Sequence, residues 1–230
     1  MKLETIKKSI ADWNNINDYY DEAVTLLNQG VMFKIDGGVA ETQGDQKPQF
    51  IHVYIGVVNN RLKLFLINNL MDDMAILKVE YSKYVYVADL EEVPSDLLED
   101  FRKSDSISYP GSNTKPNSFD GHSRIMNWAI SKNDWVKSQI NNVYGLFLAF
   151  SIPIADLDLV ASEIYGLFAL VMDDHKPGLN HYKADLIIWD RSNSNMYISD
   201  LGILEDTVTV VPPFGDSNKQ SDFSLLTTSG

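Results

Sequence analysis

The sequence contains no cysteine. Disulfide bonds, a thiolate nucleophile, cysteine-ligated zinc sites and iron–sulfur clusters are therefore excluded. Long apolar runs are also missing, because no stretch approaches the roughly 20 apolar residues that a membrane-spanning helix needs. The opening residues mix charged and apolar side chains and lack the apolar centre of a signal peptide. We therefore expect no membrane contact and a protein that is cytoplasmic or is incorporated into a virion assembled in the cytoplasm.

Positive charge is scarce. The chain has 19 Lys and Arg against 32 Asp and Glu, which gives a formal net charge of -13. Affinity for a nucleic-acid backbone comes mainly from Lys and Arg, so we expect no direct contact with nucleic acid. An acidic surface keeps a protein soluble, and it also suits a basic protein as partner.

Catalytic motifs are missing as well. Gly37 and Gly38 follow a predicted strand, but the lysine and the helix of a Walker phosphate loop do not come after them. No Gly-x-Ser-x-Gly elbow occurs in the chain. We therefore predict a non-enzymatic protein with no catalytic residues and no cofactor.

The strongest pattern that is present predicts a β-hairpin over residues 50–67. Two β-rich runs flank Asn59 and Asn60, which both tolerate the positive φ of a two-residue turn. With this turn, the pairing of the strands separates two kinds of face. One face is wholly aliphatic. The other face combines polar, aromatic and aliphatic residues with one glycine. The aliphatic face holds Val53, Ile55, Val57, Leu62, Leu64 and Leu66, and the other pairs His52 with Ile67, Tyr54 with Phe65 and Gly56 with Lys63.

The remaining patterns predict an α+β fold. We expect a mostly antiparallel sheet built on β-hairpins, with an N-terminal helical segment and short central helices. Residues 3–29 form one bent helix or a helical hairpin, which ends at Gly30. The other expected helices cover 95–101, 122–130, 133–141 and 154–162. The other expected strands cover 31–35, 39–42, 76–87, 143–152, 164–172, 185–189, 196–199 and 207–211.

One short sequence recurs. Val-Tyr-Gly-Leu-Phe occupies residues 143–147, and Ile-Tyr-Gly-Leu-Phe occupies residues 164–168. A pair of copies is compatible with a small internal repeat and equally with coincidence in two buried segments.

The domain organisation depends on two polar segments. Residues 104–120 are rich in Ser, Asn, Pro and Gly and form either a loop or a linker between two halves. We predict a single α+β domain over residues 1–213, with a possible subdivision at 104–120. Residues 214–230 follow as a polar C-terminal tail or arm.

The best candidates for metal ligands are Asp173, His175 and His181. They lie close in sequence to Asp174 and Asp185, and the Pro177-Gly178 turn between the two histidines could bring them together. Their spacing matches no metal-binding motif, so a surface turn with two exposed histidines is the favoured interpretation and no metal is predicted. An acid–base pair of Asp120 and His122 is a weaker candidate, because no nucleophile accompanies it.

These patterns favour a structural subunit of a larger protein assembly. The expected partners are other protein subunits, in a homo-oligomer or a multi-protein complex such as a phage head-to-tail connector ring. The polar tail would lie across a neighbour, and its apolar residues would be the partner-binding contacts. These residues are Phe214, Phe223, Leu225 and Leu226. The alternatives are a stand-alone binding protein, such as an immunity-type inhibitor, and a small metal-dependent enzyme.

Overall fold

The computed structural model describes most of the helices and strands of the chain. The described residues are 1–16, 19–41, 46–74, 83–93, 107–108, 118–140, 145–157, 163–172, 182–190, 195–198, 209–211 and 223–226. The helices among them are α1 (Leu3–Ile16), α2 (Tyr20–Leu27), η1 (Gly37–Ala40), α3 (Asn69–Met74), α5 (Ser118–Ile140) and η3 (Ile154–Asp156). The strands are β1 (Met32–Ile35), β2 (Phe50–Val58), β3 (Arg61–Asn68), β4 (Tyr86–Asp89), β5 (Ile107–Ser108), β6 (Ala149–Pro153), β7 (Ile164–Met172), β8 (Tyr182–Asp190), β9 (Asn195–Ile198) and β10 (Thr209–Val211).

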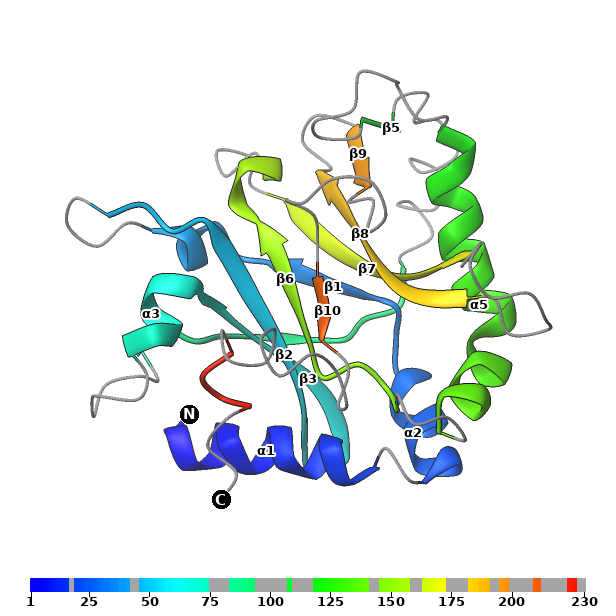
Figure 1. The fold of residues 1–230 in the computed structure, drawn as a ribbon, viewed down its shortest axis with the longest axis horizontal. Helices are drawn as coiled ribbons and strands as arrows, with labels where there is room; N and C mark the ends of the chain where they lie inside the picture. The colour runs from blue at the N-terminus through cyan, green and yellow to red at the C-terminus, as the bar shows by residue number, and fades with distance from the viewer. Residues whose placement is uncertain are drawn as a thin grey trace.

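The strands form two sheets of five strands each, which confirms the predicted α+β fold (Figure 1). The first sheet has the order β1-β7-β8-β9-β5, and the second has the order β10-β6-β2-β3-β4. The pairings are antiparallel except for that of β5 with β9, which is parallel.

The β2–β3 hairpin lies in the interior of the second sheet, with the predicted register. Val58 pairs with Arg61, and the pairing continues to Ile51 and Asn68. Asn59 and Asn60 form the turn with φ values of 51° and 60°. A twisted two-residue turn requires positive φ at both positions, and asparagine tolerates it better than most residues do.

The aliphatic face of the hairpin points into the main core. There it packs with residues from the first sheet, such as Phe33 and Phe168, and with aromatic residues of the helices. The two sheets also meet at an edge, where Met32 of β1 forms a bridge with Glu91, just beyond β4. A Cβ on Gly30 would lie 2.4 Å from the carbonyl oxygen of Glu91, so this edge leaves no room for a side chain.

Gly30 therefore has a different role from the predicted one. Helix α2 ends at Leu27, and Asn28 serves as its C-cap. The glycine does not adopt the left-handed conformation that would stop a helix. Within residues 3–29, the described part of the chain forms two separate helices, α1 and α2, and not one bent helix.

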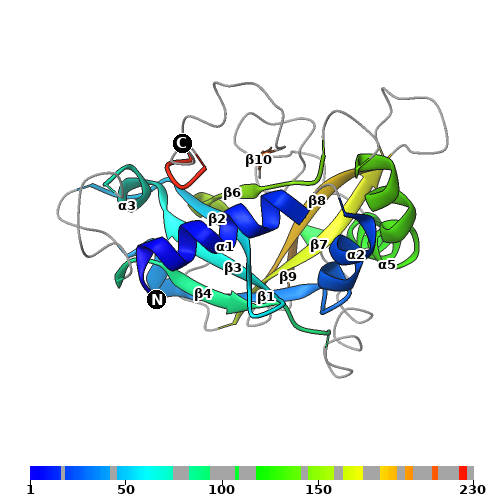
Figure 2. The same cartoon turned by 90° about the horizontal axis from the view of Figure 1, so that it is seen from below.

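The outer face of the second sheet is covered by α1 (Figure 2). Ile6 and Ile10 of this helix pack on Tyr54, Phe65 and Ile67 of the hairpin. Spacing of four residues places both isoleucines on the same side of the helix. The turn at residues 223–226, hereafter the C-terminal turn, lies beside α1 on the same face (Figure 1).

Helix α5 is one continuous helix of 23 residues, so the prediction of two short helices over 122–130 and 133–141 was wrong. Trp128 and Trp135 are both buried in the main core. Lys132 Nζ donates to the carbonyl oxygen of Leu27 at 3.2 Å and thereby ties α5 to the end of α2. Burial lowers the pKa of Lys132, while the nearby carboxylate of Glu92 acts in the opposite direction.

One further prediction was wrong. Residues 39–41 do not pair back onto β1 as a strand, because Gly37–Ala40 form the short helix η1, which the side chain of Asp36 caps by accepting from Gly38 N at 2.9 Å. Of the two interpretations of the recurring five-residue sequence, the structure favours coincidence, because the described parts of the two copies differ. Gly145 has a φ of 59° outside any strand, whereas Gly166 lies within β7.

The predicted helix at 95–101 lies outside the described residues, as do most of the predicted strand at 76–87 and most of the 104–120 segment. Among the described helices, none has the length and apolar character to cross a membrane.

Candidate functional site

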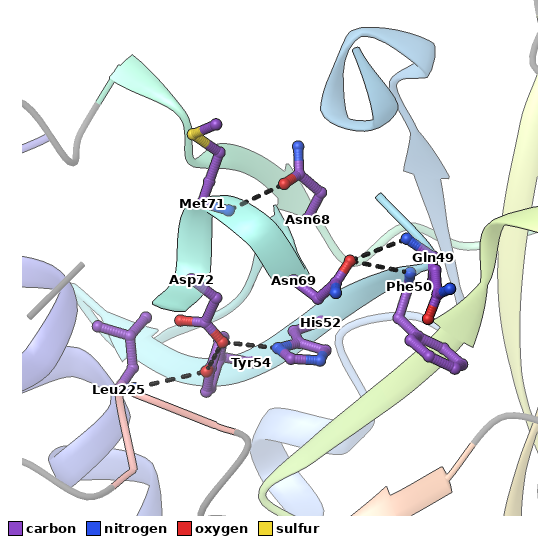
Figure 3. Close-up of polar contacts among 9 residues, drawn as sticks. All are labelled: Gln49, Phe50, His52, Tyr54, Asn68, Asn69, Met71, Asp72 and Leu225. Atoms are coloured by element: carbon purple, nitrogen blue, oxygen red, sulfur yellow. Dashed lines mark hydrogen bonds and ion pairs between the residues drawn. The ribbon is translucent and has the colours of Figure 1, made fainter. Parts of the chain in front are cut away.

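A hydrogen-bonded polar group on the outer face of the second sheet consists of His52, Tyr54 and Asp72, hereafter the His52 cluster (Figure 3). His52 and Tyr54 are two residues apart along β2 and so lie on the same face of the sheet. Asp72 comes from α3 and is fully buried. Its Oδ2 atom lies 2.6 Å from His52 Nδ1 and also accepts a hydrogen bond from the Tyr54 hydroxyl.

Two asparagines hold Asp72 in place, because they fix the start of α3. Asn68 Oδ1 accepts from Met71 N at 3.0 Å, which is the geometry of a helix N-cap (Figure 3). Asn69 Oδ1 accepts from Gln49 N at 2.9 Å and from Phe50 N at 3.2 Å. Helix α3 is thereby attached to the beginning of β2, the strand that carries the other two members of the cluster.

The C-terminal turn covers the His52 cluster. The Phe223 ring stacks on the His52 imidazole with centroids 4.3 Å apart, and it meets the Tyr54 ring edge-on at 5.6 Å. Leu225 N donates to the Tyr54 hydroxyl at 3.4 Å. Phe223 and Leu225 are 3% and 2% exposed, so both are buried within their own chain.

A histidine held by a carboxylate is an arrangement that enzymes use for general acid–base catalysis. Here the His52 side chain is only 6% exposed, and the Asp72 side chain is fully buried. While Phe223 is docked, no substrate can reach the imidazole. In this arrangement the cluster connects three separate segments, which are β2, α3 and the C-terminal turn.

A second buried polar pair lies on the other side of the molecule. Arg124 Nη1 of α5 is 2.9 Å from Asp185 Oδ2 of β8, and both side chains are almost inaccessible to solvent. Asp185 Oδ1 accepts from Leu186 N at 2.9 Å. The carboxylate therefore neutralises an arginine and also accepts a backbone hydrogen bond.

The structure also has a groove of about 440 Å³ between α2 and the turn of the β2–β3 hairpin, hereafter the α2 groove. Its more buried lining is apolar and its exposed lining is polar. The apolar residues are Ile16, Leu26 and Val57, and the polar residues are Asp21, Glu22, Thr25 and Asn60.

One side chain fixes the two walls of the α2 groove relative to each other. Gln29 Nε2 donates to the carbonyl oxygen of Asn60, and Gln29 Oε1 accepts from Leu62 N, both at 2.8 Å. The residue just beyond α2 is thus bonded to both sides of the hairpin turn. Within the part of the chain that the structure describes, no cationic side chain pairs with Asp21 or Glu22.

The predicted metal candidates Asp173, His175 and His181 lie outside the described residues, as do Asp174 and the side chains of Asp120 and His122. No group of three or more His, Asp or Glu that could hold a metal ion occurs among the residues that are described. Of the predicted partner contacts, Phe214 lies outside the described residues, and Leu226 is half-buried. Phe223 and Leu225 pack on their own sheet, and their contact with a partner stays a prediction.

Sequence reasoning placed His52 in its strand but missed its partners. A usable signal was present, because a histidine and a tyrosine on a face that is otherwise apolar require hydrogen-bond partners once they are buried. Asp72 is a carboxylate close to the end of the same hairpin. The contact with Phe223 had no comparable local signal.

No protein-family model matches this chain, and neither a curated protein nor a solved structure matches it. Arguments about its function therefore depend on the chain's own residues.

Proposed function

We propose that this protein is a non-enzymatic subunit of a larger protein assembly, and that the α2 groove holds a segment of a neighbouring protein. The observation that carries the proposal is the combination of an apolar floor, an acidic rim and walls fixed by Gln29. Protein interfaces commonly have an apolar centre surrounded by polar groups.

The chemistry of the rim favours a basic partner. The carboxylates of Asp21 and Glu22 have no cation partner among the described residues, and the whole chain carries a net charge of -13. Complementary charge raises the rate of association and excludes acidic competitors. A segment with one apolar side chain for the floor and Lys or Arg for the rim would complement the α2 groove.

Two settings fit this proposal and differ in stoichiometry. In the first, copies of the chain form a ring or another discrete oligomer, such as a component of a virion. In the second, the chain is a stand-alone inhibitor that binds one basic target protein, for which the acidity of the chain is the supporting observation.

Light scattering on the purified full-length protein tests the proposal and separates the settings. A discrete oligomer supports the first setting, and a monomer that forms a stoichiometric complex with a co-purifying protein supports the second. A monomer at all concentrations, with no bound partner, contradicts the proposal.

Variants then locate the contact. Asp21→Asn/Glu22→Gln should weaken the association, whereas Glu4→Gln/Glu91→Gln removes the same charge from exposed positions outside the groove lining and should not. Equal effects of the two variants would place the contact elsewhere.

A further inference from the structure

We propose that the α2 groove recognises an arginine side chain of the neighbouring protein, in preference to a lysine side chain. The inference rests on the proposed function, because the arginine belongs to the segment that the groove is proposed to hold. It assigns a role to the carboxylates of Asp21 and Glu22 and to the side-chain amide of Asn60. All three line the groove, and none of them makes a hydrogen bond or an ion pair with the described part of the chain.

The groove presents hydrogen-bond acceptors from both of its walls. Asp21 and Glu22 belong to the first turn of α2, whereas Asn60 belongs to the turn of the β2–β3 hairpin. Successive residues of a helix point about 100° apart, so the two carboxylates approach the groove from different directions. A group that satisfies acceptors on both walls must therefore donate in several directions at once.

A guanidinium group meets this requirement better than an ammonium group does. Arginine carries its N–H donors in a fixed plane, and the edges of that plane can face different acceptors. One guanidinium can therefore donate to a carboxylate of α2 and to Asn60 Oδ1 together. The ammonium group of lysine is a compact charge that is more strongly hydrated, so it loses more when it leaves water for the groove.

The apolar lining suits the rest of the arginine side chain. Leu26 lies one helical turn beyond Glu22 and on the same side of α2, and Val57 of β2 faces the same groove. Long basic side chains lay their methylene groups on apolar surface and direct the charged end towards a counter-charge. The volume of about 440 Å³ also lies within the range of ligand sites, which is roughly 300–1,000 Å³.

The acceptors are held in place by bonds within the chain. Gln29 attaches the end of α2 to the carbonyl oxygen of Asn60 and to Leu62 N, both at 2.8 Å. Thr25 Oγ1 donates to the carbonyl oxygen of Asp21 at 2.7 Å and so joins the first turn of α2 to the next. A site that is formed in advance has less conformational freedom to lose when a ligand binds.

The test uses the full-length protein and two probes of equal charge, which are N-acetyl-arginine methylamide and N-acetyl-lysine methylamide. Backbone amide chemical shifts in NMR spectra give each dissociation constant and locate the binding site. The arginine probe should shift signals of α2 and the hairpin turn saturably, with an affinity at least about fivefold higher than that of the lysine probe. Equal affinities, shifts confined to other surfaces or no binding of the arginine probe would each overturn the inference.

Glycine variants of the hairpin turn test the role of Asn60, because glycine adopts the positive φ of both turn positions without strain. Asn60→Gly should bring the affinities of the two probes together. Asn59→Gly is the matched control, since this neighbouring residue does not line the groove, and it should keep the difference. An undiminished preference for arginine in Asn60→Gly would contradict the proposed recognition.

The carboxylates are tested separately. Asp21→Asn/Glu22→Gln should weaken the binding of both probes by at least about tenfold, because both depend on the acidic rim. The control Glu4→Gln/Glu91→Gln should bind both probes as the wild-type protein does. Circular dichroism confirms that each variant is folded, and unchanged binding in the folded groove variant would overturn the inference.

The outcomes separate this inference from the proposed function. If the protein is an oligomer or has a co-purifying partner and the arginine probe does not bind, the inference fails and the proposed function stands. If the arginine probe binds to a monomer that has no partner, the proposed function fails and the partner's arginine with it, and the groove is then a site for a free guanidinium compound. In an assembly, a saturating concentration of the arginine probe should lower the mass seen by light scattering, and an unchanged mass would overturn the inference.

Discussion

Phe223 lies against the imidazole of His52, with ring centroids 4.3 Å apart and ring planes inclined by 26°. One residue comes from the central hairpin, and the other comes from the last segment of the chain that the structure describes. Their contact attaches the C-terminal turn to the outer face of the second sheet. This face is shared with α1, so both ends of the described chain depend on the same hairpin.

Phe223→Ala should therefore lower the free energy of unfolding. We expect a loss of about 1.5–3 kcal/mol, which is the transfer free energy of a fully buried side chain of this size. The loss should not reach the cost of a rigid core cavity, because a terminal segment can undock locally. Urea denaturation measures the change. Met172→Ala is the control, because Met172 is 61% exposed, and an equal loss in both variants would contradict the prediction.

The hairpin could be predicted from sequence because its signals are local. Asn59 and Asn60 fix the turn, and the alternation of side chains then fixes the register, since a slip by one residue would expose the aliphatic face. The predicted and observed pairings agree along the whole strand pair. Strands were also predicted at 185–189 and 196–199, and the structure pairs β8 with β9 there.

Helix α5 shows where local signals mislead. Asn133 and Asp134 are residue types typical of a helix N-cap, and a cap at this position favours two short helices over one. Trp128 and Trp135 are seven residues apart and lie on one side of a continuous helix, where both enter the core. Packing of these two large rings outweighs a preference of about 1 kcal/mol for capping.

The complete candidate site was beyond sequence reasoning for a different reason, although the burial of His52 and Tyr54 signalled that they need partners. His52, Asp72 and Phe223 come from segments whose contact depends on the tertiary fold, and no periodicity connects them. The α2 groove is likewise formed by α2 and a hairpin turn that Gln29 brings together. The helices and strands could largely be predicted from the sequence, whereas the two sites depend on side-chain hydrogen bonds between those elements.

The buried pair of Arg124 and Asp185 leads to a second prediction. Removal of one member of a buried ion pair typically costs about 3–5 kcal/mol, because the other charge loses its partner away from water. Asp185→Leu and Arg124→Met should each lower the free energy of unfolding by an amount of this order. The double variant Arg124→Met/Asp185→Leu should be more stable than either single variant, because neither charge of the pair remains.

Urea denaturation of the three variants measures the effect. The control is Lys8→Met, because the Lys8–Asp12 pair on α1 is exposed and contributes little. Additive losses in the double variant would show that the two charges are not coupled.

Gln29 provides a third prediction. Gln29→Ala removes two hydrogen bonds between the end of α2 and the hairpin turn. At roughly 1 kcal/mol for each bond, the free energy of unfolding should fall by about 1–2 kcal/mol. The N–H of Leu62, which donates to Gln29, should also exchange faster with deuterium.

Asn28→Ala is the matched control for Gln29, because the side chain of this neighbouring residue is exposed. Hydrogen exchange followed by mass spectrometry measures the local effect. An unchanged exchange rate at the hairpin turn in Gln29→Ala would mean that the glutamine does not fix the walls of the α2 groove.

The fourth prediction concerns pH and Tyr86. Burial raises the pKa of the Tyr86 phenol above its usual value of 10.0, and the carboxylates of Asp36 and Glu41 add to the shift. Well below pH 10 the phenol is neutral in both the folded and the unfolded chain, so the contribution of Tyr86 to the free energy of unfolding is fully present. As the pH rises through the unfolded pKa, the unfolded chain releases its proton first. The contribution of Tyr86 to stability is therefore lost progressively as the pH approaches and passes the raised pKa of the folded state.

Tyr86→Phe cannot lose a proton, so its stability should fall less than that of the wild-type protein between about pH 9 and about pH 11. Urea denaturation at several pH values within this range measures the difference. Tyr19→Phe, at a position that is 60% exposed, is the control and should follow the wild-type curve. Glu41→Gln should reduce the difference, because it removes one of the two carboxylates that raise the pKa of Tyr86. Parallel curves for the wild-type protein and Tyr86→Phe would show that folding does not raise the pKa of the Tyr86 phenol.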